Sequence, residues 1–175
     1  MQKRIENFAK LAVEFGVNVR KDEDVLITSP VESPELARLM TKAAYEKGAR
    51  KVSINWVDDT LTRLAYEYES QETLNEVPDW VVEKSRYQIA EKRSNRISIV
   101  SDDPDLLKGL DETKISEAVK ARSLKMKDFV KYTMNDIVSW LVISVPSIKW
   151  AEKVFPDLKG EAACDKLWEV ILDVC

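Results

Sequence analysis

The sequence predicts an α/β fold, a mostly parallel sheet of about four or more strands flanked by helices on both faces. Short β-rich runs alternate with stretches of helical periodicity along the chain, and this alternation is typical of βαβ units. Of the 175 residues, 45% are hydrophobic and 33% are charged, a composition typical of folded globular proteins. The length fits one ordinary domain, so we expect residues 1–175 to form a single α/β domain.

Four runs rich in β-branched and apolar residues predict the strands. They cover residues 24–28, 51–56, 96–101 and 137–145. The last run, Ile-Val-Ser-Trp-Leu-Val-Ile-Ser-Val, is nearly all apolar. It therefore predicts a central strand that is buried on both faces.

Apolar residues at helical spacing predict the helices between and after these strands. The predicted helices cover residues 5–15, 34–47, 58–68, 78–92 and 111–134, followed by a short helix through 155 and a last helix from about 161. Ser33 and Pro34 begin the second helix as a cap and a first-turn proline. In the last helix Val174 and Cys175 are still in phase with the apolar stripe. This predicts that the sequence was cut within a longer protein, the alternative being a terminal helix that docks its last turn.

Charge and hydropathy exclude several classes of partner. With 27 Lys and Arg against 31 Asp and Glu, the chain has no basic surplus for nucleic acid. The longest apolar run, Trp140 to Val145, is far shorter than the ~20 residues that span a bilayer. Glu6 and Glu14 interrupt what would be the apolar centre of a signal peptide. We therefore expect a cytoplasmic protein with no nucleic-acid and no membrane partner.

The residue inventory also limits the chemistry. The chain has no histidine, which excludes Ser-His-Asp and Cys-His centres and argues against a zinc site within it. Its four glycines are isolated, so neither a phosphate loop nor a dinucleotide fingerprint can be built. Cys164 and Cys175 lie eleven positions apart on one predicted helix, about 16 Å at ~1.5 Å per residue. That separation is too large for a disulfide, so we expect both thiols to be reduced and no cofactor in this chain.

Polar loops after the predicted strands are the remaining candidates, because ligands of open parallel sheets bind beyond the carboxyl ends of the strands. These loops cover residues 28–30, 56–59, 101–103 and 144–147. Helix capping and turn formation already explain most of their polar side chains. This applies to Ser33, Asp58 or Asp59, Asp103 and Ser147. The adjacent acids Asp102 and Asp103 are better explained as a cap with a solvated neighbour than as a general acid and base.

Arg122 falls in register with the apolar positions Ile115 and Phe129 of the helix predicted over residues 111–134. An arginine at such a position is expected to be at least partly covered, and a covered guanidinium needs an anionic or carbonyl partner. Arg122 is therefore either an internal clamp or a contact to something outside this chain. The clamp is the favoured interpretation.

Several segments, in order along nearly the whole chain, resemble the first half of the aminopeptidase T, aminopeptidase S and PepS family of metallo-aminopeptidases. They are Asp24 to Glu32, Asn55 to Asp59 with Leu61-Thr62-Arg63, Lys120-Ala121-Arg122-Ser123, Tyr132 to Asp136 with Ser139-Trp140, and Trp150-Ala151 through Val154-Phe155-Pro156.

The resemblance implies a longer two-domain enzyme that removes N-terminal amino acids from peptides, of which residues 1–175 are the N-terminal, non-catalytic domain. The family's two-metal centre, with Zn, Co or Mn held by Glu, His and Asp, belongs to the C-terminal half, so no catalytic or metal-binding residue transfers to this chain. Paired metals activate a water and polarise the scissile carbonyl. This chain alone is expected to be inactive, with the C-terminal catalytic domain as its partner.

The resemblance also implies a homodimer whose active sites face an internal cavity, with peptides as substrates. Trp56, Asp58, Arg63 and Arg122 are the candidates for contacts at that cavity or with the other domain, because they lie in the shared segments at strand ends or on a helical stripe. The alternative is a self-contained α/β binding module for a small ligand or a protein partner.

Overall fold

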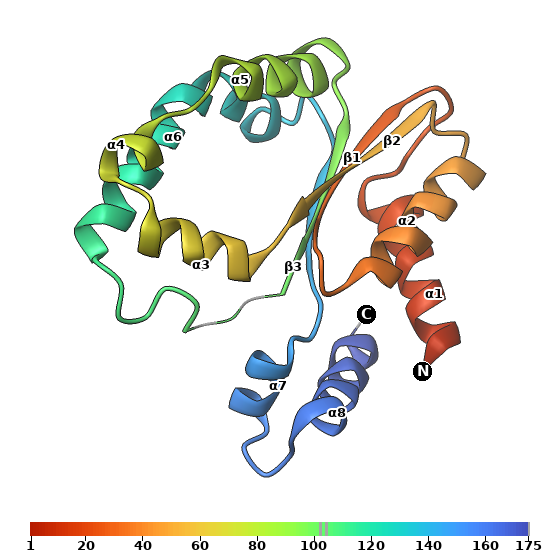
Figure 1. The fold of residues 1–175 in the computed structure, drawn as a ribbon. Coiled ribbons are helices and arrows are strands. Elements are labelled where there is room, and N and C mark those ends of the chain that lie inside the picture. The colour runs from red at the N-terminus through yellow and green to blue at the C-terminus, as the bar shows by residue number, and fades with distance from the viewer. Residues whose placement is uncertain (102, 104, 175) are drawn as a thin grey trace. The chain divides into compact units, whose positions relative to one another are not determined.

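The computed structural model describes residues 1–174 except 102 and 104, and it contains a four-stranded sheet in the order β2-β1-β3-β4 (Figure 1). All three pairings in this sheet are parallel. Helices flank the sheet, and the predicted α/β class is confirmed. The strands are β1 (Asp24–Pro30), β2 (Lys51–Val57), β3 (Asn95–Val100) and β4 (Trp140–Ser144).

The chain divides into two compact units. The single α/β domain expected from its length stays a prediction. We call the first the sheet unit; it comprises Met1–Val57, Asn95–Pro104 and Trp140–Cys175. The second, the helical unit, comprises Asp58–Ser94 and Asp105–Ser139. Each is described below by itself.

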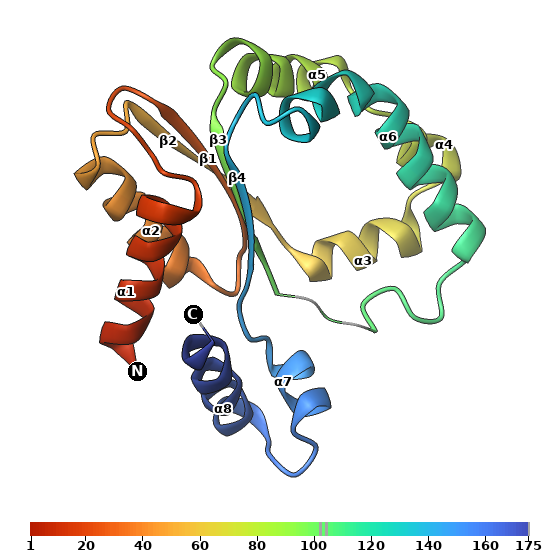
Figure 2. The same cartoon turned by 180° about the vertical axis from the view of Figure 1, so that it is seen from behind.

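The helices of the sheet unit begin and end close to the predicted positions. They are α1 (Gln2–Leu11), which continues as the π-helical turn η1 (Ala12–Gly16), α2 (Pro34–Glu46), α7 (Ile148–Val154) and α8 (Gly160–Asp173). Pro34 occupies the first turn of α2 as predicted, whereas the Ser33 side chain makes no cap hydrogen bond. Helices α7 and α8 lie side by side as a hairpin (Figure 2).

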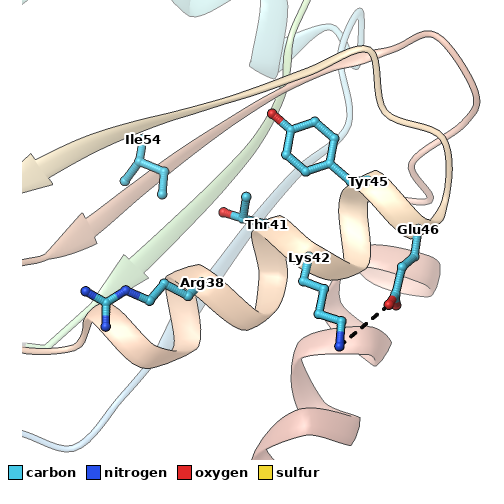
Figure 3. Close-up of a pocket in the computed structure, with 6 residues that line it drawn as sticks. All are labelled: Arg38, Thr41, Lys42, Tyr45, Glu46 and Ile54. Carbon is cyan, nitrogen blue, oxygen red and sulfur yellow. Dashed lines mark ion pairs between the residues drawn. The ribbon is translucent and has the colours of Figure 1, made fainter.

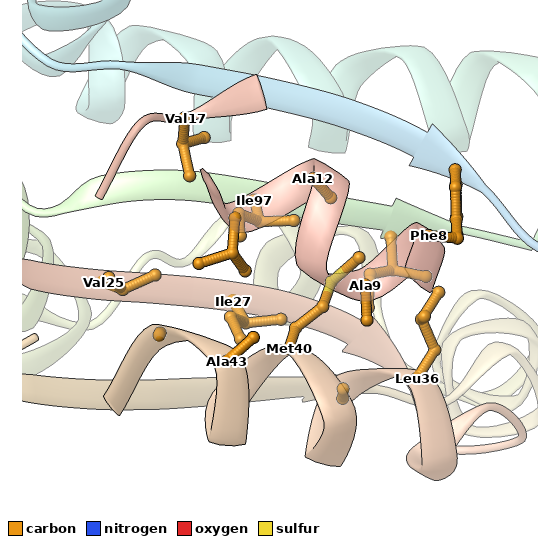
Figure 4. Close-up of a cluster of buried hydrophobic side chains, with 14 of the residues drawn as sticks. Phe8, Ala9, Ala12, Val17, Val25, Ile27, Leu36, Met40, Ala43 and Ile97 are labelled. Atoms are coloured by element: carbon orange, nitrogen blue, oxygen red, sulfur yellow. The ribbon is translucent and has the colours of Figure 1, made fainter. Parts of the chain in front are cut away.

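The main hydrophobic core lies between one face of the sheet and helices α1, η1 and α2 (Figure 4). Central strand β1 contributes Val25 and Ile27, which point to the same face because side chains alternate along a strand. Phe8 on α1 and Met40 on α2 cover them, at positions spaced for the buried side of a helix. We call this covered side of the sheet the core face.

A smaller cluster packs α7 against α8 within the C-terminal hairpin. Ala151, Ala163 and Leu167 form its buried centre. The Trp168 ring meets Phe8 edge-on, with centroids 6.3 Å apart, and so ties α8 to α1. Val174 lies beyond the end of α8 and is 82% exposed. The prediction that it continues the apolar stripe of this helix is therefore wrong. Cys175 lies outside the described residues.

The helical unit contains five helical segments. They are α3 (Asp59–Tyr68), α4 (Gln71–Asn75), α5 (Asp79–Ser85), the π-helical turn η2 (Arg86–Glu91) and α6 (Glu112–Met134). Helix α5 and η2 together occupy the single helix predicted over residues 78–92. The sequence did not predict α4, because a five-residue helix shows little periodicity; it begins where the Ser70 hydroxyl accepts a hydrogen bond from the Thr73 amide.

The prediction of a central, doubly buried fourth strand is wrong. Among the described residues β4 pairs with β3 alone and lies at the edge of the sheet, and its Trp140 and Val142 are 47% and 54% exposed. Leu141 and Ile143 point the other way and pack against the core. An apolar run shows that a strand is hydrophobic, but only the strand order decides whether both faces receive a cover.

Among the described helices, none combines the length and the apolar character that crossing a bilayer requires.

Candidate functional site

The carboxyl ends of the four strands lie along one edge of the sheet, because all four strands run parallel. In the sheet unit this edge includes Ser29, which is fully buried and donates from its hydroxyl to the Pro30 carbonyl at 3.2 Å. It also includes Trp56, near the end of β2, whose side chain is 46% exposed. Of these two, only Trp56 offers its side chain to a ligand or to another protein surface.

A buried acid follows β3 at the same edge. The Asp103 side chain is only 8% exposed and forms an ion pair with Lys149 on α7, with 2.6 Å between Oδ2 and Nζ. Asp103 therefore holds α7. The prediction that it caps a helix is wrong, because residues 105–109 form turns and the next helix begins at Glu112. Asp102, its partner in the predicted acid pair, lies outside the described residues.

Two of the predicted caps are confirmed. The Asp58 carboxylate accepts a hydrogen bond from the Leu61 amide at 3.0 Å and starts α3. The Ser147 hydroxyl accepts one from the Trp150 amide at 3.1 Å and starts α7. Each side chain satisfies an amide that the helix itself leaves without a partner.

Arg63 is a clamp within the helical unit. Its guanidinium pairs with Glu67 at 2.9 Å and donates to the carbonyl oxygens of Leu106 and Lys108 at 2.6 and 3.3 Å. These carbonyls lie 43 and 45 residues further along the chain, so Arg63 fastens α3 to the segment that leads into α6. Its Nε and Nη1 donors are engaged within the unit.

Arg122 does not behave as predicted. The structure places it on α6 in phase with Ile115 and Phe129, which are half-buried, yet the Arg122 side chain is exposed. The described residues offer it no hydrogen bond or ion pair, so the favoured interpretation as an internal clamp is wrong. A long side chain with a charged end can leave a partly covered stripe and keep its guanidinium in water.

The four candidates are divided between the two units. Trp56 belongs to the sheet unit, whereas Asp58, Arg63 and Arg122 belong to the helical unit. No hydrogen bond or ion pair between described residues joins any two of them. Asp58 and Arg63 have partners in their own unit, which leaves Trp56 and Arg122 as the exposed members.

An open groove of about 590 Å³ lies between α2 and the edge strand β2 (Figure 3). Its polar groups largely serve the protein itself. The Tyr45 hydroxyl accepts from the Val52 amide at 3.2 Å, and Lys42 pairs with Glu46 at 3.8 Å. The groove thus offers mainly apolar surface, to which Ile54 contributes.

The donors present do not fit the two-metal centre that the resemblance implies. Among described residues, no group of three or more His, Cys, Asp or Glu side chains is placed to hold a metal ion, and the chain has no histidine. Cys164 is half-buried and free, and burial raises the pKa of its thiol. A raised thiol pKa disfavours the thiolate form that binds metals.

The sequence analysis missed Arg96, a half-buried arginine at the second position of β3. Desolvation by burial lowers the pKa of its guanidinium. A signal was available: in Arg96-Ile97-Ser98-Ile99 polar and apolar residues alternate, which indicates that the second face of this strand is polar.

Comparison with known proteins gives one consistent family. Residues 1–175 match the family described as thermophilic metalloprotease (M29). The chain is 40% identical to aminopeptidase AmpS of Bacillus subtilis and 35% identical to aminopeptidase 2 of Geobacillus stearothermophilus, over 96% and 99% of its own length. It spans only 41% and 42% of those two relatives.

A solved structure shows the same fold. Wild-type AmpT from Thermus thermophilus superposes with a TM-score of 0.90 at 29% sequence identity. The match covers 98% of this chain and 43% of that one. In both comparisons the matched region is a fraction of the relative's length. The match of residues 1–175 to the family confirms the resemblance.

Proposed function

Because this chain belongs to the M29 family of thermophilic metalloproteases, we propose that it is the N-terminal, non-catalytic part of a metal-dependent aminopeptidase that removes N-terminal amino acids from peptides. The observation behind this proposal is the length relation. The match to aminopeptidase AmpS covers 96% of this chain but only 41% of that relative. The remaining length is sufficient for a separate catalytic part.

The proposed catalytic centre lies in that remaining part. Divalent ions such as Zn, Co or Mn need several carboxylate and imidazole ligands held close together. The described residues contain no such group, and we assign the ligands to the C-terminal part. The whole protein is proposed to be a homodimer in the cytoplasm.

This chain then contributes binding surface rather than catalytic groups. Trp56 and Arg122 are the candidates for direct contact with peptide or with the C-terminal part, because both side chains are exposed. Asp58 and Arg63 act indirectly by holding α3 through their bonds to Leu61 and Leu106.

The first experiment extends the protein. The coding sequence is read past the codon for Cys175, and the chain and the extended protein are both assayed on aminoacyl substrates with added Zn²⁺, Co²⁺ or Mn²⁺. We expect metal-dependent release of the N-terminal residue by the extended protein and none by residues 1–175. Metal-dependent turnover by residues 1–175 alone would falsify this placement of the active centre.

The second experiment tests the contact residues in the extended protein. Trp56→Ala and Arg122→Ala are expected to lower kcat/KM for peptides by about tenfold each, the effect of losing roughly 1.4 kcal/mol of binding. Phe15→Ala is the matched control, since Phe15 is a 74% exposed aromatic on η1 outside the candidate set. Peptide turnover equal to that of the control, with unchanged folding, discards the contact role.

The alternative, a self-contained binding module for a small ligand, is favoured by one observation. Arg96 is half-buried and has no hydrogen bond or ion pair within the described part of the chain. A stop codon directly after Cys175, together with a lack of peptidase activity, would support this alternative over the aminopeptidase.

A further inference from the structure

The sheet has a second face, opposite the core face, with an unusual composition. Ile97 and Ile99 of β3 lie in the core, so alternation places Arg96, Ser98 and Val100 on the second face. Parallel sheets are usually apolar on both faces. The polar residues on this face therefore need an explanation.

The strand register shows which residues share this face. Arg96 pairs with Leu26 on one side and with Trp140 on the other, and Ser98 pairs in the same way with Thr28 and Val142. Neighbouring strands lie about 4.8 Å apart, so the arginine and the two hydroxyl-bearing residues form one small area. Trp140 borders it with an indole that is 47% exposed.

Arg96 is the group on this face that needs an explanation, because its charged side chain is half-buried. Desolvation is the cause that lowers its pKa. No described residue forms a hydrogen bond or ion pair with it. Arg50 and Arg63, in contrast, reach Asp24 and Glu67 at 2.5 and 2.9 Å. A guanidinium removed from water without an anion is unfavourable, so the position suits a bound anion.

The charges around Arg96 favour the same ligand. The one carboxylate that alternation along the four strands places on the second face is that of Asp24, at the start of β1. Its Oδ2 pairs with Arg50, whereas its Oδ1 is buried and has no hydrogen-bond partner among the described residues, Arg96 included. Lys51, the register partner of Asp24, adds another cation. A guanidinium binds a carboxylate through two parallel N–H bonds, and the hydroxyls of Thr28 and Ser98 can donate to the same group.

We propose that the second face of the sheet binds the carboxyl-terminal carboxylate of a short peptide, with Arg96 contacting the carboxylate and Ser98 and Thr28 as flanking donors. The choice of a peptide rests on the proposed function, whereas the carboxylate chemistry rests on Arg96 and its neighbours. The site would recognise the end of the peptide opposite to the one that an aminopeptidase cleaves. It would favour short substrates with a free carboxylate.

The first test measures binding by residues 1–175. Acetyl-Ala-Ala with a free carboxylate and the same dipeptide as its carboxyl amide are titrated, and the arginine Nε–Hε signals are followed by NMR. The acetyl group removes the amino terminus, so the pair differs only at the carboxylate. We expect the acid to bind more tightly than the amide and to shift the Arg96 signal.

Variants distinguish binding at Arg96 from a general effect of positive charge on the protein. Arg96→Gln is expected to weaken binding of the acid about tenfold, as for the loss of a charge-assisted pair, and to leave the amide unchanged. Arg96→Lys keeps the charge without the two-pronged geometry and should fall between wild type and Arg96→Gln. Arg93→Gln is the matched control, because Arg93 is an exposed arginine just before β3. Equal binding of acid and amide by wild type, or equal loss in Arg93→Gln, overturns the proposal.

The second test uses the extended protein and compares kcat/KM for a tripeptide acid, its amide and an aminoacyl p-nitroanilide. Arg96→Gln should abolish the preference for the acid and retain turnover of the p-nitroanilide. An equal loss on all three substrates would mean that Arg96 contacts a carboxylate of the C-terminal part, which overturns the peptide assignment. If wild type turns over none of them while residues 1–175 still bind the acid, the proposed function fails and the site stands.

Discussion

The two units of this chain are stabilised in different ways. Both hydrophobic clusters lie entirely in the sheet unit, where Val13, Ile27 and Met40 have no exposed surface. The helical unit buries few of its described apolar side chains and exposes large ones such as Tyr68, Trp80 and Met134 at 82%, 68% and 67%. The sheet unit thus has a core of its own, whereas the helical unit relies on caps and long-range hydrogen bonds.

This difference has a consequence for function. A unit with few buried contacts opens locally at lower cost than a packed core, and exposed apolar surface marks places where other protein surfaces bind. The helical unit is therefore the part of the chain most suited to local changes of conformation. The sheet unit is suited to act as the rigid support.

The largest expected effect comes from removing core volume in the sheet unit. Ile27→Ala should lower the free energy of unfolding by about 2–5 kcal/mol, because a fully buried side chain is lost and a cavity remains. Leu124→Ala, at a 59% exposed position of α6, should change it by less than about 0.5 kcal/mol. Urea unfolding measures both, and similar values for the two variants would contradict the comparison.

A smaller effect is expected from the hydrogen bonds of the helical unit. Arg63→Met should cost about 1 kcal/mol, since it leaves the Leu106 carbonyl without its donor; the value allows for the partial exposure of the arginine. Arg86→Met is the control, because Arg86 pairs with Glu83 and Glu91, which are close to it in sequence.

Hydrogen exchange locates this effect. Faster exchange of the α3 amides in Arg63→Met, with the β1 amides unchanged, is the expected result. Equal protection of α3 in Arg63→Met and Arg86→Met would show that the clamp does not hold the helix.

The smallest effect concerns pH at the α7–α8 connection. The backbone amide of Gly160, with a further contribution from Lys159, lowers the pKa of Glu152 below its ordinary value near 4.5. A carboxylate with a lowered pKa stabilises the folded protein above its unfolded-state pKa, and this contribution is lost as pH falls through the folded-state value.

Acid should therefore loosen the connection, and the protection of the Gly160 amide, taken relative to its intrinsic exchange rate at each pH, should fall as the pH drops below the ordinary pKa of a glutamate. Glu152→Gln should remove this pH dependence and leave the exchange of the core amides unchanged. A Gly160 amide whose protection follows the same pH profile in both proteins would exclude Glu152 as the cause.

Local patterns predicted the elements well because their causes are local. Pro34 in the first turn of α2 and the caps at Asp58 and Ser147 were all foreseen, since each involves contacts within a few residues. Arg63 was foreseen only as a candidate contact, and its role as a clamp was not. Its carbonyl partners lie more than 40 residues away along the chain. Because every residue has a backbone carbonyl, the sequence does not show which ones will accept from Arg63.

The sequence by itself determined that this chain forms an α/β fold and, through its distributed resemblance, which family it belongs to. Periodicity and capping act over a few residues, and a family is identified by the residue types at successive positions of the sequence. The tertiary structure decided that β4 is an edge strand, that Arg122 is exposed and that Arg96 lacks a described partner. Each of these depends on which distant segment covers a side chain, and burial of that kind is a property of the assembled fold.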